Sequence, residues 1–150
     1  MSLVHSNRRT NWTPTITNSA NAIPSLPGAT GATATAGSIA VQHATFVRLG
    51  MQVLFWIRFT TSVTWGAANF LNLNVTLPVP LDTSFSNTGD ATGVVSFAVR
   101  SAGSTIGDLN GLVEADLVND QIKIGLRTTR TPAVGAITYA ISCNGVYEVV

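Results

Sequence analysis

The amino-acid sequence predicts an all-β protein folded as a single antiparallel β-sandwich or jelly roll with an extended N-terminal arm. Apolar residues recur at every second position in several short segments, which is the repeat of a half-buried strand. No window shows the 3.6-residue repeat of an amphipathic helix, and only residues 108–117 suggest a helical turn. The length of 150 residues fits one domain, and a hydrophobic fraction of 45% supplies apolar side chains for a core.

The first part of the chain predicts the arm. Residues 18–38 read NSANAIPSLPGATGATATAGS, a run of small and turn-forming residues in which Pro24, Pro27 and repeated Gly disfavour a helix. Such a segment buries too little apolar surface to offset its own ordering entropy, so it becomes ordered only against another surface. We therefore divide the chain into an extended arm, residues 1–38, and a β-sandwich domain, residues 39–150.

Strands follow one another after residue 38. The segments that we expect to be strands are 39–49, 52–60, 70–77, 95–99, 122–126 and 137–143. In the segment 52–60, the side chains expected to face the core are Val53, Phe55, Ile57 and Phe59. Tight turns are expected at Asn110-Gly111, Asn144-Gly145 and Asn119-Asp120, because these residues tolerate a positive φ.

Leu54 and Trp56 alternate with the core-facing residues and therefore point away from the core. Together with Phe70 they would form an apolar patch that is costly to leave in water on a monomer. A second sheet would cover this patch, and so would a subunit interface, in which aromatic residues are favoured. Leu54, Trp56 and Phe70 are the candidate residues of an oligomer interface.

Composition excludes several classes of protein. Eight Lys and Arg against seven Asp and Glu give a net charge of +1, too small for a broad nucleic-acid-binding surface. No apolar stretch reaches the roughly 18 residues of a membrane span, and the first residues lack the apolar core of a secretory signal. The lone Cys143 is expected to be a buried, inert thiol. We therefore expect no nucleic acid, no membrane and no disulfide framework.

No catalytic or metal-binding pattern stands out. His5 lies in the terminal segment, and His43 lies inside an expected strand with no partner pattern beside it. The acidic residues nearest one another in sequence match no calcium loop, so we expect them to be solvated loop charges; they are Asp108, Glu114, Asp116 and Asp120. No phosphate-binding motif is present. The prediction is a protein that is not an enzyme, with no metal site and no cofactor.

Four short segments, in this order, resemble a group of small β-sandwich proteins from the virions of tailed bacteriophages, found as head decorations, fibre tips and tail knobs. The segments are 11–16 (NWTPTI), 46–53 (FVRLGMQV), 73–80 (LNVTLPVP) and 141–148 (ISCNGVYE). In that group a W-T-P-T segment and a low-complexity stretch precede a strand pair, an LP exit and a closing strand that ends in G-x-Y. Phe46 stands where the group usually has Tyr.

The resemblance implies a homotrimer in which the sandwich is a knob and the N-terminal segment is its attachment. We therefore expect a virion structural protein, assembled in the host cytoplasm and placed on the outer surface of the particle. Its expected role is that of a capsid decoration, or cement, protein that binds the major capsid protein and bridges neighbouring capsid subunits through its arm. The residues expected to contact the capsid are Arg8, Arg9, Trp12, Ile23 and Leu26.

The alternative role is the receptor-binding tip domain of a tail or head fibre. In that role the partner is a host surface glycan, because sugar sites often combine an aromatic face with amide groups. Trp65 and the Asn- and Thr-rich loop at residues 85–92 are the features that favour this alternative.

Overall fold

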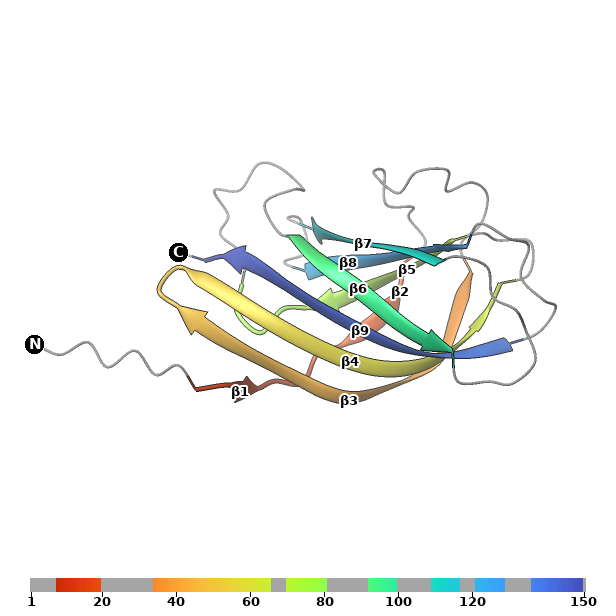
Figure 1. The fold of residues 1–150 in the computed structure, drawn as a ribbon, viewed down its shortest axis with the longest axis horizontal. Coiled ribbons are helices and arrows are strands. Elements are labelled where there is room, and N and C mark those ends of the chain that lie inside the picture. The colour runs from red at the N-terminus through yellow and green to blue at the C-terminus, as the bar shows by residue number, and fades with distance from the viewer. Residues whose placement is uncertain are drawn as a thin grey trace, which may run out of the picture.

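The computed structural model describes residues 8–19, 34–65, 70–80, 92–99, 109–116, 121–128 and 136–149, and these ranges form two antiparallel sheets (Figure 1). None of the described residues lies in a helix. Sheet A has the order β1-β3-β4-β9-β6, and sheet B has the order β2-β5-β8-β7. The predicted all-β antiparallel sandwich is confirmed.

The strands of sheet A are β1 (Thr10–Asn11), β3 (Thr35–Leu49), β4 (Gln52–Thr64), β9 (Ala136–Glu148) and β6 (Thr92–Val99). Those of sheet B are β2 (Ile16–Asn18), β5 (Phe70–Thr76), β8 (Gln121–Thr128) and β7 (Leu109–Asp116). From β4 to β9 the chain alternates between the sheets except at β7 and β8, which are neighbours in sheet B. This alternation is the kind of connection found in jelly rolls.

The core lies between the inner faces of the two sheets. As predicted, the alternate residues of β4 face it, and Val53, Phe55, Ile57 and Phe59 are at most 2% exposed. The facing side chains of sheet B are Leu71, Leu73, Val75, Ile122, Ile124 and Leu126, all at most 1% exposed. Each such side chain contributes about 1.5–3 kcal/mol by leaving water, so this layer supplies most of the driving force for folding.

The polar atoms of the core aromatic residues have partners. The Trp65 indole Nε1–H donates to the Tyr139 hydroxyl at 2.8 Å. The Tyr147 hydroxyl in turn donates to the Val79 carbonyl oxygen at 2.8 Å and accepts from the Val79 N–H at 3.2 Å. These bonds fix the ends of β9 against the segments that flank β5.

The β3–β4 hairpin forms the long curved arm of sheet A in Figure 1. Leu49 pairs with Gln52 across a two-residue turn, and Gly50 adopts a φ of 61° there. A positive φ is costly for a residue with a Cβ, and it is typical of the first position of a two-residue hairpin turn. The Arg48 Nε–H also donates to the Gly50 carbonyl oxygen at 3.0 Å, which braces the turn.

Two of the predicted turns are wrong. Asn110-Gly111 lies inside β7, and Asn144-Gly145 lies inside β9, where Gly145 pairs with Phe55. The helical turn suggested at 108–117 is wrong as well, since residues 109–116 are the strand β7. Pairing along a full ladder outweighs the local preference of Asn-Gly for a turn. Asn119-Asp120 lies outside the described residues.

The structure differs from the predicted arm in the part that it describes. Residues 10–11 pair with β3 as the edge strand of sheet A, and residues 16–18 pair with β5 as the edge strand of sheet B. The side chains of Trp12 and Ile16 pack against the core, which supplies the apolar burial that we had not attributed to this segment. The long strand also begins at Thr35, before the boundary predicted at residue 38.

Ser19 and Ala34, the described residues on either side of 20–33, are both anchored on β5. The Ser19 N–H donates to the Asn72 carbonyl oxygen at 2.9 Å, and the Ala34 N–H donates to the Phe70 carbonyl oxygen at 2.7 Å. Both acceptors lie on β5, two residues apart. Residues 20–33, which include the predicted capsid contacts Ile23 and Leu26, lie outside the described residues.

Candidate functional site

The outer face of sheet A carries a patch in which apolar and basic side chains meet. Strand register places Val47, Leu54 and Val146 in one row across β3, β4 and β9. Trp56 lies on the same face two residues further along β4. Leu54 and Trp56 are half-buried, and Val146 is 37% exposed. We name the residues Arg9, Val47, Leu54, Trp56 and Val146 the Arg9–Trp56 patch.

Arg9 lies over the Trp56 ring. Its guanidinium carbon is 4.9 Å from the ring centroid, which is the geometry of a cation–π contact. Thr45, which pairs with Trp56 on the neighbouring strand, is only 3% exposed. A residue expected to bind the capsid and a residue expected to lie in an oligomer interface therefore share one surface. Nothing in the sequence pattern indicated this contact, because 46 positions separate the two residues and β3 lies between them.

The charged side chains of β3 and β4, and those just before β1, are all positive. Arg8, Arg9, Arg48 and Arg58 are all exposed. The first 81 residues contain these four Arg and no Asp, Glu or Lys. Among the described residues of sheet A, Glu148, at the end of β9, is the one acidic residue. Arg9 and Arg58 lie on the outer face with Trp56, whereas Arg48 pairs with the core-facing Val53 at the end of β3. The outer face of sheet A is therefore suited to a partner surface that carries carboxylates.

Phe70 does not belong to this patch. It is 2% exposed within the single chain. Alternation along β5 places Phe70 with Asn72 on the face opposite Leu71, which is the outer side of sheet B. Phe70 and Trp56 lie on different sheets, so Phe70 does not form one patch with Leu54 and Trp56.

Trp12 is half-buried and packs against the edge of the hydrophobic core. Its ring meets those of Phe46 and Phe55 edge to face, with centroids 6.3 and 6.4 Å apart. Its Nε1 is buried and has no hydrogen-bond partner in the described structure. An unsatisfied buried donor of this kind costs about 1–3 kcal/mol. Trp12 therefore covers the edge of the core, and its indole N–H stays without an acceptor in the described structure.

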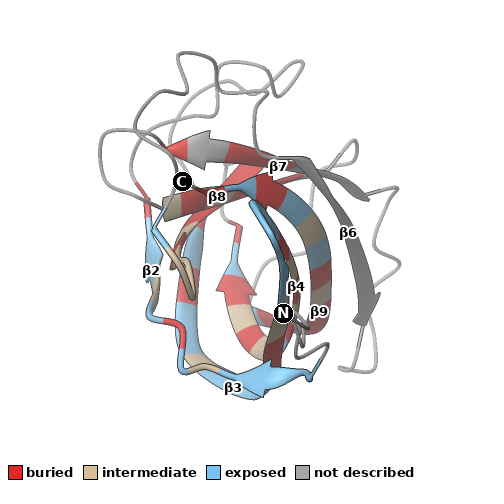
Figure 2. Cartoon of the chain, turned by 90° about the vertical axis from the view of Figure 1, so that its left-hand side faces the viewer, coloured by how far each residue is buried: buried red, intermediate tan, exposed pale blue. Residues whose placement is uncertain are grey.

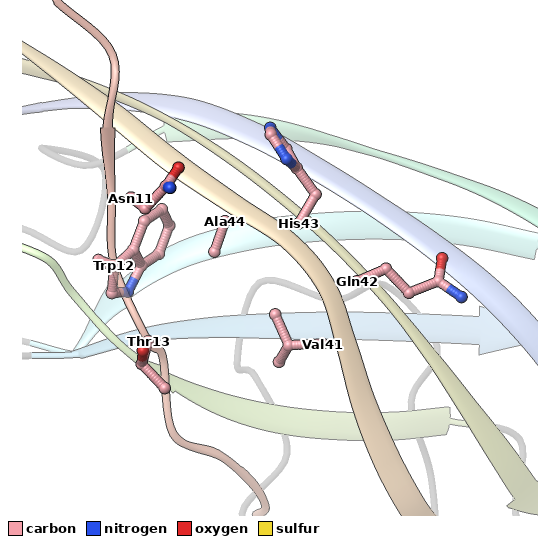
Figure 3. Close-up of a pocket in the computed structure, with 7 residues that line it drawn as sticks. All are labelled: Asn11, Trp12, Thr13, Val41, Gln42, His43 and Ala44. Carbon is pink, nitrogen blue, oxygen red and sulfur yellow. The ribbon is translucent and has the colours of Figure 1, made fainter.

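A pocket of about 320 Å³ lies where the chain leaves the edge of β3 (Figure 3). The last backbone bond before this point runs from the Trp12 N–H to the Ala44 carbonyl oxygen, at 3.2 Å. Pro14 has no N–H with which to continue the ladder, and the chain passes instead to sheet B. The register of β3 also shifts between Val41 and His43. The pocket is lined by Asn11, Trp12, Thr13, Val41, Gln42, His43 and Ala44.

Two carboxyl groups that we expected to be solvated are buried in β7. Asp116 is 6% exposed and forms an ion pair with Lys123, with Oδ2 and Nζ 3.2 Å apart. Glu114 is 7% exposed and pairs with Lys123 in the strand register. Burial raises the pKa of the Glu114 carboxyl, and the positive charge of Lys123 opposes this rise. The prediction of loop charges is wrong here, while Asp108 and Asp120 lie outside the described residues.

The remaining candidate groups have structural roles in the described part of the chain. Cys143 is buried, and burial raises the pKa of its thiol to about 12, so it carries no thiolate at neutral pH. Trp65 is 2% exposed and cannot stack on a sugar. The described residues contain no group of three or more His, Cys, Asp or Glu placed to hold a metal ion.

Comparison with protein-family models, with curated proteins and with solved structures finds no match. Within the described ranges, no helix is long and apolar enough to cross a membrane. The function is therefore proposed from the sequence resemblance, the fold and the Arg9–Trp56 patch.

Proposed function

We propose that this chain is a non-enzymatic structural protein of a bacteriophage virion, a capsid decoration protein that binds the outer surface of the head and bridges neighbouring capsid subunits. The proposal rests on the sequence resemblance described above and is supported by the compact β-sandwich fold. The observation that carries it is the basic, aromatic outer face of sheet A.

Arginine and tryptophan are the residues that dominate many protein–protein contacts. Arg8 and Arg9 are exposed at the β1 edge, and Arg48 is exposed at the nearby end of β3. Guanidinium groups pair with carboxylates in a bidentate geometry. The partner is the major capsid protein, through a surface that presents Asp or Glu side chains to this edge. The contact surface is thus the sandwich itself, with Arg8 and Arg9 at its rim.

The chain acts as a homotrimer in this proposal. The row Val47, Leu54 and Val146, near the β3–β4 hairpin end of sheet A, provides an apolar contact for a neighbouring subunit. Three copies that each bind one capsid subunit would raise the overall affinity through effective concentration, which is how a small protein staples a large shell.

Counting copies in purified virions of the phage that encodes the chain tests the proposed role. We expect a copy number comparable with that of the capsomers, measured by quantitative mass spectrometry. A count that matches only the few fibres or tails of a particle would contradict a decoration role.

Capsids that lack the protein provide a second test. The double variant Arg8→Ala and Arg9→Ala is expected to bind them at least tenfold more weakly, with a smaller dependence on salt, because one or two desolvated charge pairs contribute this much. Arg127→Ala, which removes one positive charge from sheet B, is the matched control and should bind normally. Equal binding by both variants would contradict the assigned contact edge.

The alternative role of a receptor-binding fibre tip rested on Trp65 and on the loop at residues 85–92, and it loses the first of these two features. Trp65 donates its indole N–H to Tyr139 inside the core, and it is not available to a glycan. Residues 85–91 lie outside the described residues.

A further inference from the structure

We propose that the pocket beside Trp12 binds one neutral saccharide unit, a role that goes beyond capsid attachment. The pocket volume of about 320 Å³ is near the lower end of the roughly 300–1,000 Å³ typical of small-molecule sites. A single pyranose ring fits such a volume better than an extended chain does. The ligand class follows from the groups that line the pocket.

The lining residues include the polar side chains of Asn11, Thr13, Gln42 and His43, and none of them is Asp, Glu, Lys or Arg. Asn11 and Gln42 supply carboxamides, which both donate and accept, and Thr13 supplies a hydroxyl. Sugar hydroxyls also both donate and accept, so they match this mixture of groups. Val41 and Ala44 give the pocket an apolar wall that suits the C–H face of a pyranose ring.

His43 is held in place on one side of the pocket. Its Nε2 and the Thr45 hydroxyl are 3.2 Å apart, within hydrogen-bond distance. The shift of register between Val41 and His43 lets the two side chains leave the strand in different directions, as Figure 3 shows. Bulges of this kind re-aim side chains next to binding sites. The imidazole is therefore positioned before any ligand arrives.

The indole Nε1–H of Trp12 is a second feature of this site that favours a ligand with hydroxyl groups. The nitrogen is buried, and none of the described residues accepts a hydrogen bond from it. Contacts with Phe46 and Phe55 hold the ring from the core side. A sugar oxygen seated against the ring would supply the missing acceptor after a small rotation of the side chain. The N–H proton of Trp12 therefore reports directly on ligand binding.

The same edge is poorly suited to a peptide strand, which is the competing kind of ligand. Strand addition needs a regular row of free backbone groups. The register of β3 shifts twice along this edge, between Ala36 and Ile39 and between Val41 and His43. Bulged edges of this kind are a known means of preventing strand addition. Figure 2 shows that β3 is exposed along much of its length.

Nuclear magnetic resonance on the ¹⁵N-labelled protein tests the proposal. The chain has three Trp residues, and therefore three indole N–H signals, which Trp→Phe variants assign. We expect methyl glucoside, methyl galactoside or N-acetylglucosamine to shift the Trp12 signal in a saturable way. The signals of Trp56 and Trp65 should stay in place. An unchanged Trp12 signal with all three sugars at millimolar concentrations would overturn the proposal.

Variants of two exposed residues separate binding from folding. Gln42→Ala and Asn11→Ala should each raise the dissociation constant of the active sugar about three- to tenfold, the effect of one lost hydrogen bond. Asn144→Ala, an exposed amide on the outer face of sheet A, is the matched control and should leave the constant unchanged. Trp12→Phe keeps an aromatic ring but removes the donor, and it should raise the dissociation constant by at least the same factor, measured from the backbone amide shifts of the pocket residues.

Two results would contradict the assignment. Equal sugar binding by Gln42→Ala, Asn11→Ala and the control would place the sugar elsewhere on the protein. A Trp12 signal that shifts with an unstructured peptide and not with the sugars would identify a peptide groove instead. Neither result bears on capsid binding, which depends on Arg8 and Arg9.

Discussion

The guanidinium group of Arg9 lies over the indole ring of Trp56, with 4.9 Å between its central carbon and the ring centroid. This contact ties β1, a strand of two residues, to the middle of sheet A across β3. It holds the N-terminal segment on the sandwich, and it places a positive charge and an aromatic ring on the same surface.

Arg9→Ala should lower the free energy of unfolding by about 0.5–1 kcal/mol, the usual contribution of an exposed cation–π pair. Trp56→Leu should remove the same contribution, so the double variant should be less destabilised than the sum of the two. Urea denaturation measures all three values. Arg8→Ala, for which the structure records no ring contact, is the control. Additive effects of Arg9→Ala and Trp56→Leu would show that the two side chains do not interact.

Asn18 connects the two sheets at the opposite end of β3. Its side-chain amide donates to the Ala36 carbonyl oxygen at 2.9 Å and accepts from the Ala36 N–H at 2.8 Å. Asn18→Ala leaves both backbone groups without these partners and should cost about 1–3 kcal/mol. Thr17→Ala, at the exposed neighbouring position, should cost less than about 0.5 kcal/mol.

Hydrogen exchange gives a local check on the same pair. The Ala36 amide should exchange faster in the Asn18→Ala variant, whereas the amides at the centre of β4 should be unaffected after correction for global stability. Unchanged protection at Ala36 would mean that another group had replaced the amide of Asn18.

Glu114 should make the protein less stable as the pH rises. Its pKa is raised in the folded state by burial, so the folded protein holds this proton more tightly than the unfolded chain does. The stabilisation is complete below the ordinary pKa of 4.5 and is lost as the pH rises through the folded-state value. Glu114→Gln has no ionisable carboxyl at this position and therefore lacks this pH dependence. The stability of the variant relative to that of the wild type should rise between pH 4 and pH 7.

Denaturation of the wild type and of Glu114→Gln across this pH range measures the difference. Asp116→Asn is the contrasting variant, because it removes the carboxylate that pairs with Lys123 and should destabilise the protein at neutral pH. A constant difference between wild type and Glu114→Gln from pH 4 to pH 7 would contradict the assigned pKa shift.

Cys143 should not react with thiol reagents in the native protein. The side chain is 2% exposed, and burial raises its pKa to about 12, so both access and thiolate are lacking. Labelling with a disulfide reagent at pH 8 should be complete in denaturant and negligible without it. Rapid native labelling would mean that β9 opens locally far more often than its place between β4 and β6 suggests.

The period-two pattern was sufficient to predict the fold class and the core. The prediction for Val53, Phe55, Ile57 and Phe59 succeeded because alternation is a local property that survives any arrangement of sheets. The predicted turn at Asn144-Gly145 failed because pairing with β4 on one side and β6 on the other outweighs a dipeptide preference. Alternation and dipeptide preferences predict where strands lie, but they carry no information on which strands pair.

The candidate site was harder to predict for the same reason. Leu54 and Trp56 were assigned correctly to the outward face from alternation within one strand. The contact between Arg9 and Trp56 depends on β1 lying beside β3, and the pocket depends on a shift of register at Gln42. Pro14 was the one local signal available, since a residue without an N–H marks the point where the chain must leave a ladder.

The anchoring of Ser19 and Ala34 on neighbouring carbonyl groups of β5 has a practical consequence. The two acceptors are two residues apart on one strand, or about 7 Å at the usual rise of a strand. A short Gly-Ser bridge could therefore replace residues 20–33 without moving either β2 or β3. For the same reason, a foreign epitope grafted between these two anchors would be displayed at a defined place on the sandwich.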